Sequence, residues 1–122
     1  MGDLAKAVKN GISNEFVNWA NKFGKKIVRP VTTSQIRNIF GTIKKLEMSS
    51  HVDLPELLLL KPRIAYAVRR NSGLQELAEE LTTAIDAVDE ARDEPAKLEE
   101  RFRRFCQGFE AILAYHRAHG GN

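Results

Sequence analysis

Residues 32–45 constrain the fold more than any other stretch, because they specify both where a helix begins and which of its sides is buried. The hydroxyl of Thr32 can accept from a free backbone N–H of the first turn, and Gln35 can reach back to it, as in a capping box. Apolar residues then recur at steps of three and four, the spacing of one helix face. They are Ile36, Ile39, Phe40, Ile43 and Leu46. We therefore expect an amphipathic helix that packs against other helices.

A second side of this expected helix is basic and contains a glycine. It carries Arg37, Gly41, Lys44 and Lys45. Glycine in mid-helix costs about 1 kcal/mol relative to alanine, so its presence needs a compensating role. Two interpretations stay open. Gly41 packs against a neighbouring helix, which is the commoner reason for a helix glycine, or it lets a backbone or phosphate pass between Arg37 and Lys44.

The same helical periodicity continues in four further segments, and no strand-like alternation interrupts it. The expected helices cover residues 4–28, 53–70, 74–91 and 95–118 in addition to 32–45. Pro62 must kink or restart the helix that contains it, because proline lacks an N–H. With 122 residues, the chain suits one hydrophobic core. The sequence thus predicts an all-α protein, a single-domain bundle of about five helices over residues 1–122.

Positive and negative charges are divided unevenly along the chain, although the net charge is only +3. Residues 1–72 contain 13 lysines and arginines against 5 acidic residues, whereas residues 73–122 contain 6 against 11. Such a division indicates one part that faces a polyanion and another that faces water or a basic neighbour. The alternative is that both halves are solvated and pair with each other across the bundle.

Two further groups of cations have the spacing of a helix surface. Arg63, Ala67 and Arg70 repeat the pattern of a small residue between two cations, at steps of four and three. The other group, at the expected end of the first helix, is Lys22, Lys25, Lys26 and Arg29. Cations there stabilise the helix dipole by about 0.3–1 kcal/mol each at low salt, which alone could account for them. The same group would also suit a phosphate backbone.

Signs of catalysis or metal binding are weak in this sequence. The carboxylates of segment 74–91 lie on the polar face of an amphipathic helix, where no buried neighbour would tune their pKa for acid–base chemistry. Cys106 has an apolar setting that predicts a buried thiol, and a single thiol forms no intrachain disulfide, which indicates a reducing cytoplasm. His116 and His119 are spaced to share a metal but have no third ligand in view, so we interpret them as frayed terminal histidines.

Several sequence motifs of enzymes and membrane proteins are absent. There is no glycine-rich phosphate loop, no HExxH, no Cys/His zinc spacing, and no apolar run of about 18 residues that would span a membrane. We therefore expect neither a catalytic residue nor a cofactor or metal, and no membrane partner. The pattern favours a binding module over an enzyme, and a small enzyme built on Asp, Glu and His pairs remains as a third alternative.

Three runs of the sequence resemble one known family. They are VTTSQIRNIF, LKPRIAYAVRR and RFCQGFEAILAYHRAHGG, in this order. Together they are similar to the small helical subunit of type III-A CRISPR RNA-guided effector (Csm) complexes. In that family a TTS-x-[LI]-R-N stretch opens the central helix, an [RK]-x-x-[LIF]-x-Y…R stretch follows, and an RF-x-x-[YF]-x-EA-x-x-AY…GG helix closes the chain. The resemblance covers roughly residues 30–121.

The resemblance implies a non-catalytic role in antiviral defence. Several copies of a five-helix protein would stack along the guide RNA and help to hold the duplex of guide RNA and target RNA. The implied partners are these two RNAs, the backbone subunit, the large subunit and other copies of the chain. Arg37 fits the arginine of the first motif, while Lys61 and Arg70 fit the cations of the second. Arg69 departs from the family, which commonly has glycine there.

The expected mechanism is electrostatic. Lysines and arginines would neutralise phosphates and fix the register without reading bases, so we expect binding that falls with salt and has little sequence preference. The candidate RNA-binding residues are Arg37, Lys44, Lys61, Arg63, Arg70, Lys25, Lys26 and Arg29. Of these, Lys44, Arg63, Lys25, Lys26 and Arg29 come from the charge patterns alone. The main alternative is a helical protein–protein adaptor whose basic face binds an acidic partner.

Overall fold

The computed structural model describes residues 2–121, which form six α-helices and one short 3-10 helix, with no strand among them. The elements are α1 (Asp3–Asn10), α2 (Asn14–Lys26), α3 (Thr33–Glu47), α4 (Leu54–Arg70), η1 (Ser72–Leu74), α5 (Gln75–Asp89) and α6 (Pro95–Ala118). The all-α prediction is confirmed, and the number of helices is six where about five were expected.

The additional helix arises because the expected helix 4–28 is two helices. Gly11 separates them with φ 101°, a left-handed conformation that favours glycine. Ser13 then caps α2, since its hydroxyl accepts from the N–H of Phe16 at 3.1 Å. The apolar spacing continues across this break, which is why periodicity alone predicted one helix.

The predicted start of α3 is confirmed in detail. Thr32 Oγ1 accepts from Gln35 N–H at 3.2 Å, and Gln35 Oε1 accepts from Thr32 N–H at 2.8 Å, which completes the capping box. The apolar side of α3 contacts the core through buried Ile36 and Ile43 and through partly buried Ile39, Phe40 and Leu46.

Helix α4 is continuous from Leu54 to Arg70 with Pro62 inside it, so a restart at Pro62 does not occur. Asp53 caps this helix by accepting from Glu56 N–H at 3.2 Å. Pro62 is exposed, as expected on the outer side of a helix at the edge of the bundle. Only Leu57, Leu60 and Ile64 of this helix are buried.

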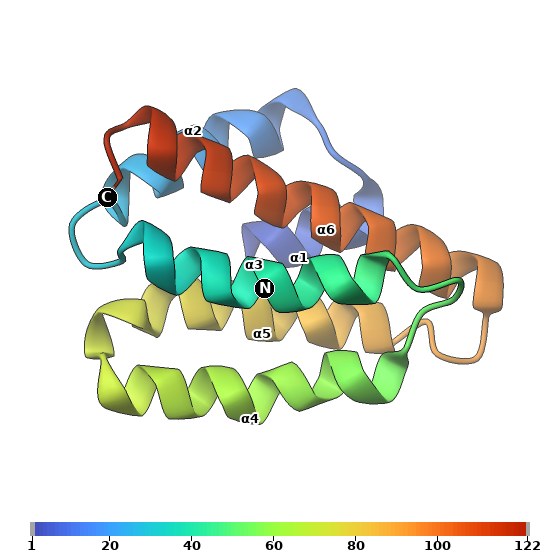
Figure 1. Cartoon of the computed structure of the whole chain (residues 1–122). Coiled ribbons are helices and arrows are strands. Elements are labelled where there is room, and N and C mark those ends of the chain that lie inside the picture. The colour runs from blue at the N-terminus through green and yellow to red at the C-terminus, as the bar shows by residue number, and fades with distance from the viewer. Residues whose placement is uncertain (1, 122) are drawn as a thin grey trace.

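The helices pack around one core to which α5 and α6 contribute most (Figure 1). Helix α1 lies against α5 and α6, α2 lies along α6, and α4 lies along α5 with little direct contact to α3. Helices α3 and α4 run antiparallel, so the start of α3 lies at the same end of the bundle as the end of α4. The end of α2 and the end of α6 are at that same end (Figure 1).

Candidate nucleic-acid interface

The turn between α2 and α3 is fixed to the rest of the bundle at two points. His116 is fully buried on α6, and its Nε2–H donates to the carbonyl of Val31 at 2.6 Å. Pro30 lies against Gly73, where a Cβ would come within 2.5 Å of the Pro30 carbonyl oxygen. The interpretation of His116 as a frayed terminal residue is therefore wrong. These contacts place the start of α3 beside the end of α4.

Four of the eight candidate cations are paired with carboxylates. The pairs are Lys26–Glu76 at 2.9 Å, Lys44–Glu47 at 3.1 Å, Lys61–Asp86 at 2.6 Å and Arg63–Glu56 at 3.9 Å. The Glu47 carboxylate also raises the pKa of Lys44, through a hydrogen bond and its charge. Pairs as exposed as these add little to stability, because water and salt screen the two charges. They are weak, but they occupy the cation.

Pairing between the two halves of the chain accounts for part of the charge division. Lys9 pairs with Glu90 at 3.2 Å, and the Lys26–Glu76 and Lys61–Asp86 pairs likewise join the basic half to the acidic helix α5. For these residues the alternative is thus correct, namely that the basic and acidic halves of the chain pair with each other across the bundle. It does not account for the remaining candidates.

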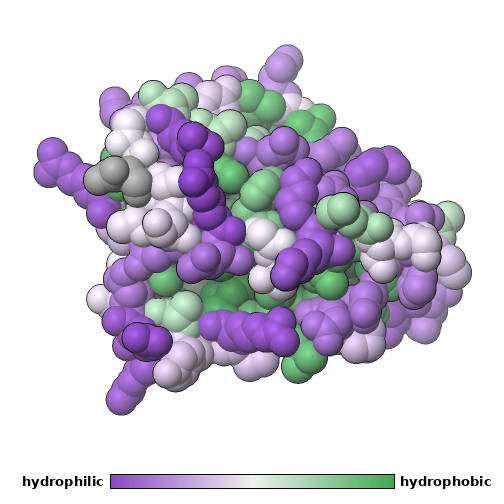
Figure 2. Space-filling model, in the orientation of Figure 1, coloured by the Kyte–Doolittle hydropathy of each residue, from purple (hydrophilic) through white to green (hydrophobic). Residues whose placement is uncertain are grey.

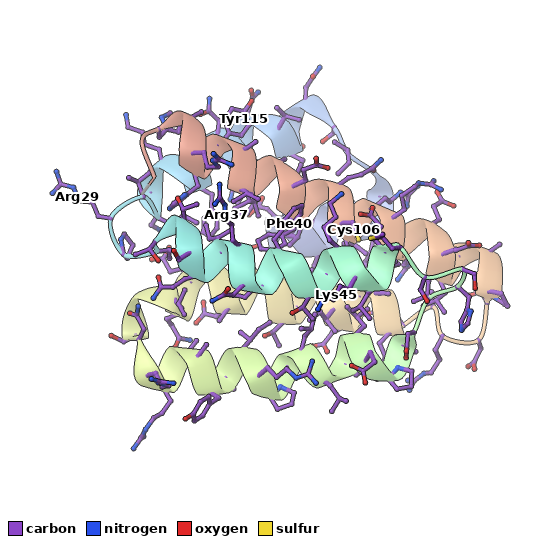
Figure 3. All side chains as sticks on the ribbon, in the orientation of Figure 1. Arg29, Arg37, Phe40, Lys45, Cys106 and Tyr115 are labelled. Carbon is purple, nitrogen blue, oxygen red and sulfur yellow. The ribbon has the colours of Figure 1, made fainter. Side chains whose placement is uncertain are left out.

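The other four candidates, Lys25, Arg29, Arg37 and Arg70, are exposed and form no ion pair with any residue of 2–121. Lys25 is in the last turn of α2, Arg29 in the following turn, Arg37 in the first half of α3, and Arg70 at the end of α4. The antiparallel packing of α3 and α4 brings these segments to one end of the bundle, which we call the basic end. Figure 3 shows Arg29 extending outward there and Arg37 on the side of α3 nearer to α6.

The structure does not bring Lys44, Lys61 and Arg63 to this end. Lys44 is in the second half of α3, while Lys61 and Arg63 are near the middle of α4. Lys26 is beside Lys25 but is paired with Glu76. The candidate set therefore divides into an unpaired group at the basic end and a paired group, of which only Lys26 lies near that end.

The exposed side of α3 contains an open position at Gly41. A Cβ placed on this glycine would meet nothing within 4 Å, and the residue is exposed. Packing against a neighbouring helix is thus the wrong explanation for Gly41. The other interpretation, close approach of a backbone or phosphate beside Arg37, is compatible with this open position.

A groove of about 580 Å³ separates the first half of α3 from the second half of α4. This α3–α4 groove is lined by Gln35, Asn38, Ile39, Tyr66, Ala67, Arg70, Asn71 and Leu74. Figure 2 shows hydrophobic atoms at the bottom of the furrow between these helices and hydrophilic side chains on its rims. Tyr66 is 63% exposed, and the Arg70 guanidinium carbon is 5.9 Å from the centre of its ring.

Sequence reasoning assigned Tyr66 to packing and did not consider Asn38. It placed Lys45 on the same side of the helix as Arg37 and did not choose it as a candidate. The available signal was a second polar side of α3, since Gln35, Asn38, Thr42 and Lys45 follow at steps of three, four and three. Figure 3 shows Lys45 on the side of α3 that faces α4. The sequence shows that α3 has two polar sides, but only the packing of the helices determines which of them faces α4.

Two titratable side chains lie in or near the core, since Cys106 is buried and Glu80 is partly buried. Burial raises the pKa of the Cys106 thiol to about 12, so this cysteine stays protonated and unreactive near neutral pH. Glu80 of α5 has its pKa raised by burial, and its Oε1 accepts from the N–H of Leu4 at 3.1 Å, which joins α5 to α1. Across residues 2–121, no three His, Cys, Asp or Glu side chains are grouped closely enough to hold a metal. None of the helices described is both long and apolar enough to cross a membrane.

Comparison with known families gives one match. The family model described as Csm2 Type III-A matches residues 12–122, which adds α2 to the region of resemblance. The comparisons with curated proteins and with solved structures each found no match. Because the matched region contains α2 to α6 and nearly the whole chain, the protein belongs to the Csm2 family, the small subunits of type III-A CRISPR Csm effector complexes.

Proposed function

We propose that this protein is a non-catalytic RNA-binding small subunit that stacks in several copies along the duplex of guide RNA and target RNA, in antiviral defence. The observation that carries the proposal is the basic end, where three helices and a turn bring together four exposed cations that have no carboxylate partner among residues 2–121. The backbone subunit, the large subunit and further copies of the chain are the proposed protein partners. Family membership supports this assignment.

The cations of the basic end would bind phosphates directly. Each Lys or Arg that neutralises a phosphate releases a counterion, which makes affinity fall with salt and leaves base identity unread. The four paired candidates, Lys26, Lys44, Lys61 and Arg63, must exchange a carboxylate for a phosphate to contribute. We therefore rank them as secondary contacts.

Gly41 would support backbone contact on α3. Gly41 lies between Arg37 and Lys44, about one helical turn from each. The RNA backbone could therefore approach the helix at Gly41 without meeting a side chain there. This role is compatible with the cost of about 1 kcal/mol that glycine imposes on the helix.

One copy of the chain has few unpaired cations, so several copies on one RNA would be needed for tight binding. Linked sites gain affinity from a high effective concentration, without any new contact. The exposed acidic side chains of α5, such as Glu79, are the proposed contact to a neighbouring subunit.

The test is a salt titration of the full chain with a labelled RNA duplex and a labelled single strand, from 50 to 200 mM salt. Removing one phosphate contact lowers the slope of log affinity against log salt by about 0.7–0.9. We expect Arg37→Ala to do so. The matched control is Arg103→Ala, which removes one exposed arginine that forms no ion pair with residues 2–121, in the first half of α6 and away from the basic end.

Equal losses for the two variants would contradict the proposal, because the basic end would then have no special role. If the wild-type chain binds no RNA at 50 mM salt but binds an acidic protein, the adaptor function replaces the RNA-binding function.

A further inference from the structure

We propose that the α3–α4 groove binds one unstacked base of RNA, next to the phosphate contacts of the basic end. This inference rests on the proposed RNA-binding function and adds a second kind of contact to it. The lining of the groove carries the argument, because it combines an apolar floor, three amides, an exposed aromatic ring and an arginine.

The floor of the groove suits the flat face of a base. Ile39, Ala67 and Leu74 contribute apolar surface from α3, α4 and the end of η1. The volume of about 580 Å³ lies inside the range of about 300–1,000 Å³ that is usual for small-molecule sites. A base could therefore enter without displacing helix α3 or α4.

The amides around the floor have hydrogen-bond donors to spare. Gln35 Oε1 already accepts from Thr32 N–H, and Asn71 Oδ1 accepts from Gly73 N–H at 3.0 Å. Their NH₂ groups make no hydrogen bond with residues 2–121, and the Asn38 side chain makes none at all within that range. These groups can donate to the carbonyl oxygens and ring nitrogens that bases expose when unpaired, with Asn38 able to accept as well.

Tyr66 and Arg70 complete the site. An aromatic side chain that is 63% exposed is available for stacking, and base–aromatic stacking tolerates any base. The Arg70 guanidinium lies 5.9 Å from the Tyr66 ring centre, so a nucleotide stacked on Tyr66 would have its phosphate within reach of Arg70. Arg37 lies outside the groove, on the side of α3 nearer to α6, so Arg70 is the phosphate contact of this site.

The charge of the lining favours RNA over a segment of protein. None of the residues that line this groove is acidic. The neighbouring groove between α4 and α5 has a similar volume but contains Glu79 and no aromatic residue. Of these two grooves, the α3–α4 groove is therefore the one that offers an aromatic ring for a base together with an arginine for its phosphate.

The experiment compares three RNA duplexes of one sequence at 50 mM salt, namely one fully paired, one with a single bulged uridine, and one with an abasic bulge. Binding to the full chain is measured by fluorescence anisotropy. The wild type should bind the bulged uridine more tightly than the other two. Tyr66→Ala should lower affinity for that RNA by about 5- to 100-fold, as expected for loss of one base–aromatic stack, and leave the paired duplex unchanged.

Three further variants sharpen the test. Tyr66→Phe keeps the ring and should keep the preference for the bulged uridine, while Asn38→Ala should reduce it. Leu59→Ala is the matched control, because Leu59 is 45% exposed on α4 but does not line the groove. It should leave all three affinities unchanged.

Equal binding of the uridine bulge and the abasic bulge by the wild type, or unchanged binding by Tyr66→Ala, would overturn the base site and leave the proposed function intact. If Tyr66→Ala and Asn38→Ala instead release a protein subunit from the assembled complex, the groove binds protein. Failure of the wild type to bind any of the three RNAs would overturn the proposed function itself.

Discussion

The basic stripe of α3 and the basic stripe of α4 have the same pattern in the sequence and different surroundings in the structure. Each has a small residue between two cations, Gly41 between Arg37 and Lys44 in α3, and Ala67 between Arg63 and Arg70 in α4. Gly41 faces open space, whereas Ala67 is partly buried and lines the α3–α4 groove. The same spacing thus produces an open helix surface in one case and the wall of a groove in the other.

Within each stripe one cation is paired and one is not. Lys44 pairs with Glu47 and Arg63 with Glu56, while Arg37 and Arg70 lack a carboxylate partner within residues 2–121. Because α3 and α4 are antiparallel, the two unpaired arginines come to the same end of the bundle. The comparison teaches that spacing identifies a basic surface, and that ion pairing decides which of its cations are available.

The largest expected effect is the loss of RNA binding when the charge of both unpaired arginines, Arg37 and Arg70, is reversed. Removing two phosphate contacts should lower affinity by about 100-fold at 50 mM salt, and the double variant Arg37→Glu/Arg70→Glu should do at least this. Reversing the two paired cations, as Lys44→Glu/Arg63→Glu, is the matched control with the same change of charge. If the control loses as much affinity as the test variant, the distinction between paired and unpaired cations is wrong.

An intermediate effect is expected from substituting alanine for two helix glycines. At Gly108 on α6 a Cβ would overlap Cδ1 of buried Leu4, so Gly108→Ala should destabilise the protein by about 1–3 kcal/mol. Gly41→Ala meets no atom and should stabilise by about 0.5–1 kcal/mol, since alanine favours the helix.

Urea unfolding measures both changes, and RNA binding is measured on the same samples. Gly41→Ala should weaken RNA binding despite its higher stability, because it fills the space beside Arg37. A stabilised Gly41→Ala protein with full RNA affinity would show that this glycine has no role in contact with the backbone.

The smallest expected effect comes from releasing a paired cation. Glu56→Gln removes the carboxylate that is 3.9 Å from Arg63, an exposed pair whose loss should change the free energy of unfolding by less than about 1 kcal/mol. Freed from its partner, Arg63 should bind phosphate better, so RNA affinity should rise by a few fold. Unchanged affinity would mean that Arg63 lies outside the RNA surface.

The sequence predicted those features that depend on neighbouring residues. Thr32 and Gln35 form the expected capping box, and α4 covers Leu54–Arg70 where a helix over residues 53–70 was expected. Pro95 begins α6 as expected, and Cys106 is buried. In each case the signal and the structure it specifies are within a few residues of each other.

Features that depend on contacts between distant segments were missed. His116 has the sequence position of a fraying helix end, yet Val31 and Gly121 cover it. Tyr66 has the spacing of a core residue, but α4 is at the edge of the bundle and leaves this ring exposed. The partners of Lys26 and Lys61 are on α5, far away in the sequence, so only the packing of the helices could identify them.

The most direct test of the account compares two arginines of one helix, Arg63 and Arg70. Each is changed to alanine, and the slope of log RNA affinity against log salt is measured for both variants and the wild type. The account predicts that Arg70→Ala lowers the slope by about 0.7–0.9 and that Arg63→Ala lowers it by clearly less, because Arg63 is paired with Glu56. Equal reductions, or a larger one for Arg63→Ala, would contradict the claim that the unpaired cations of the basic end bind the RNA.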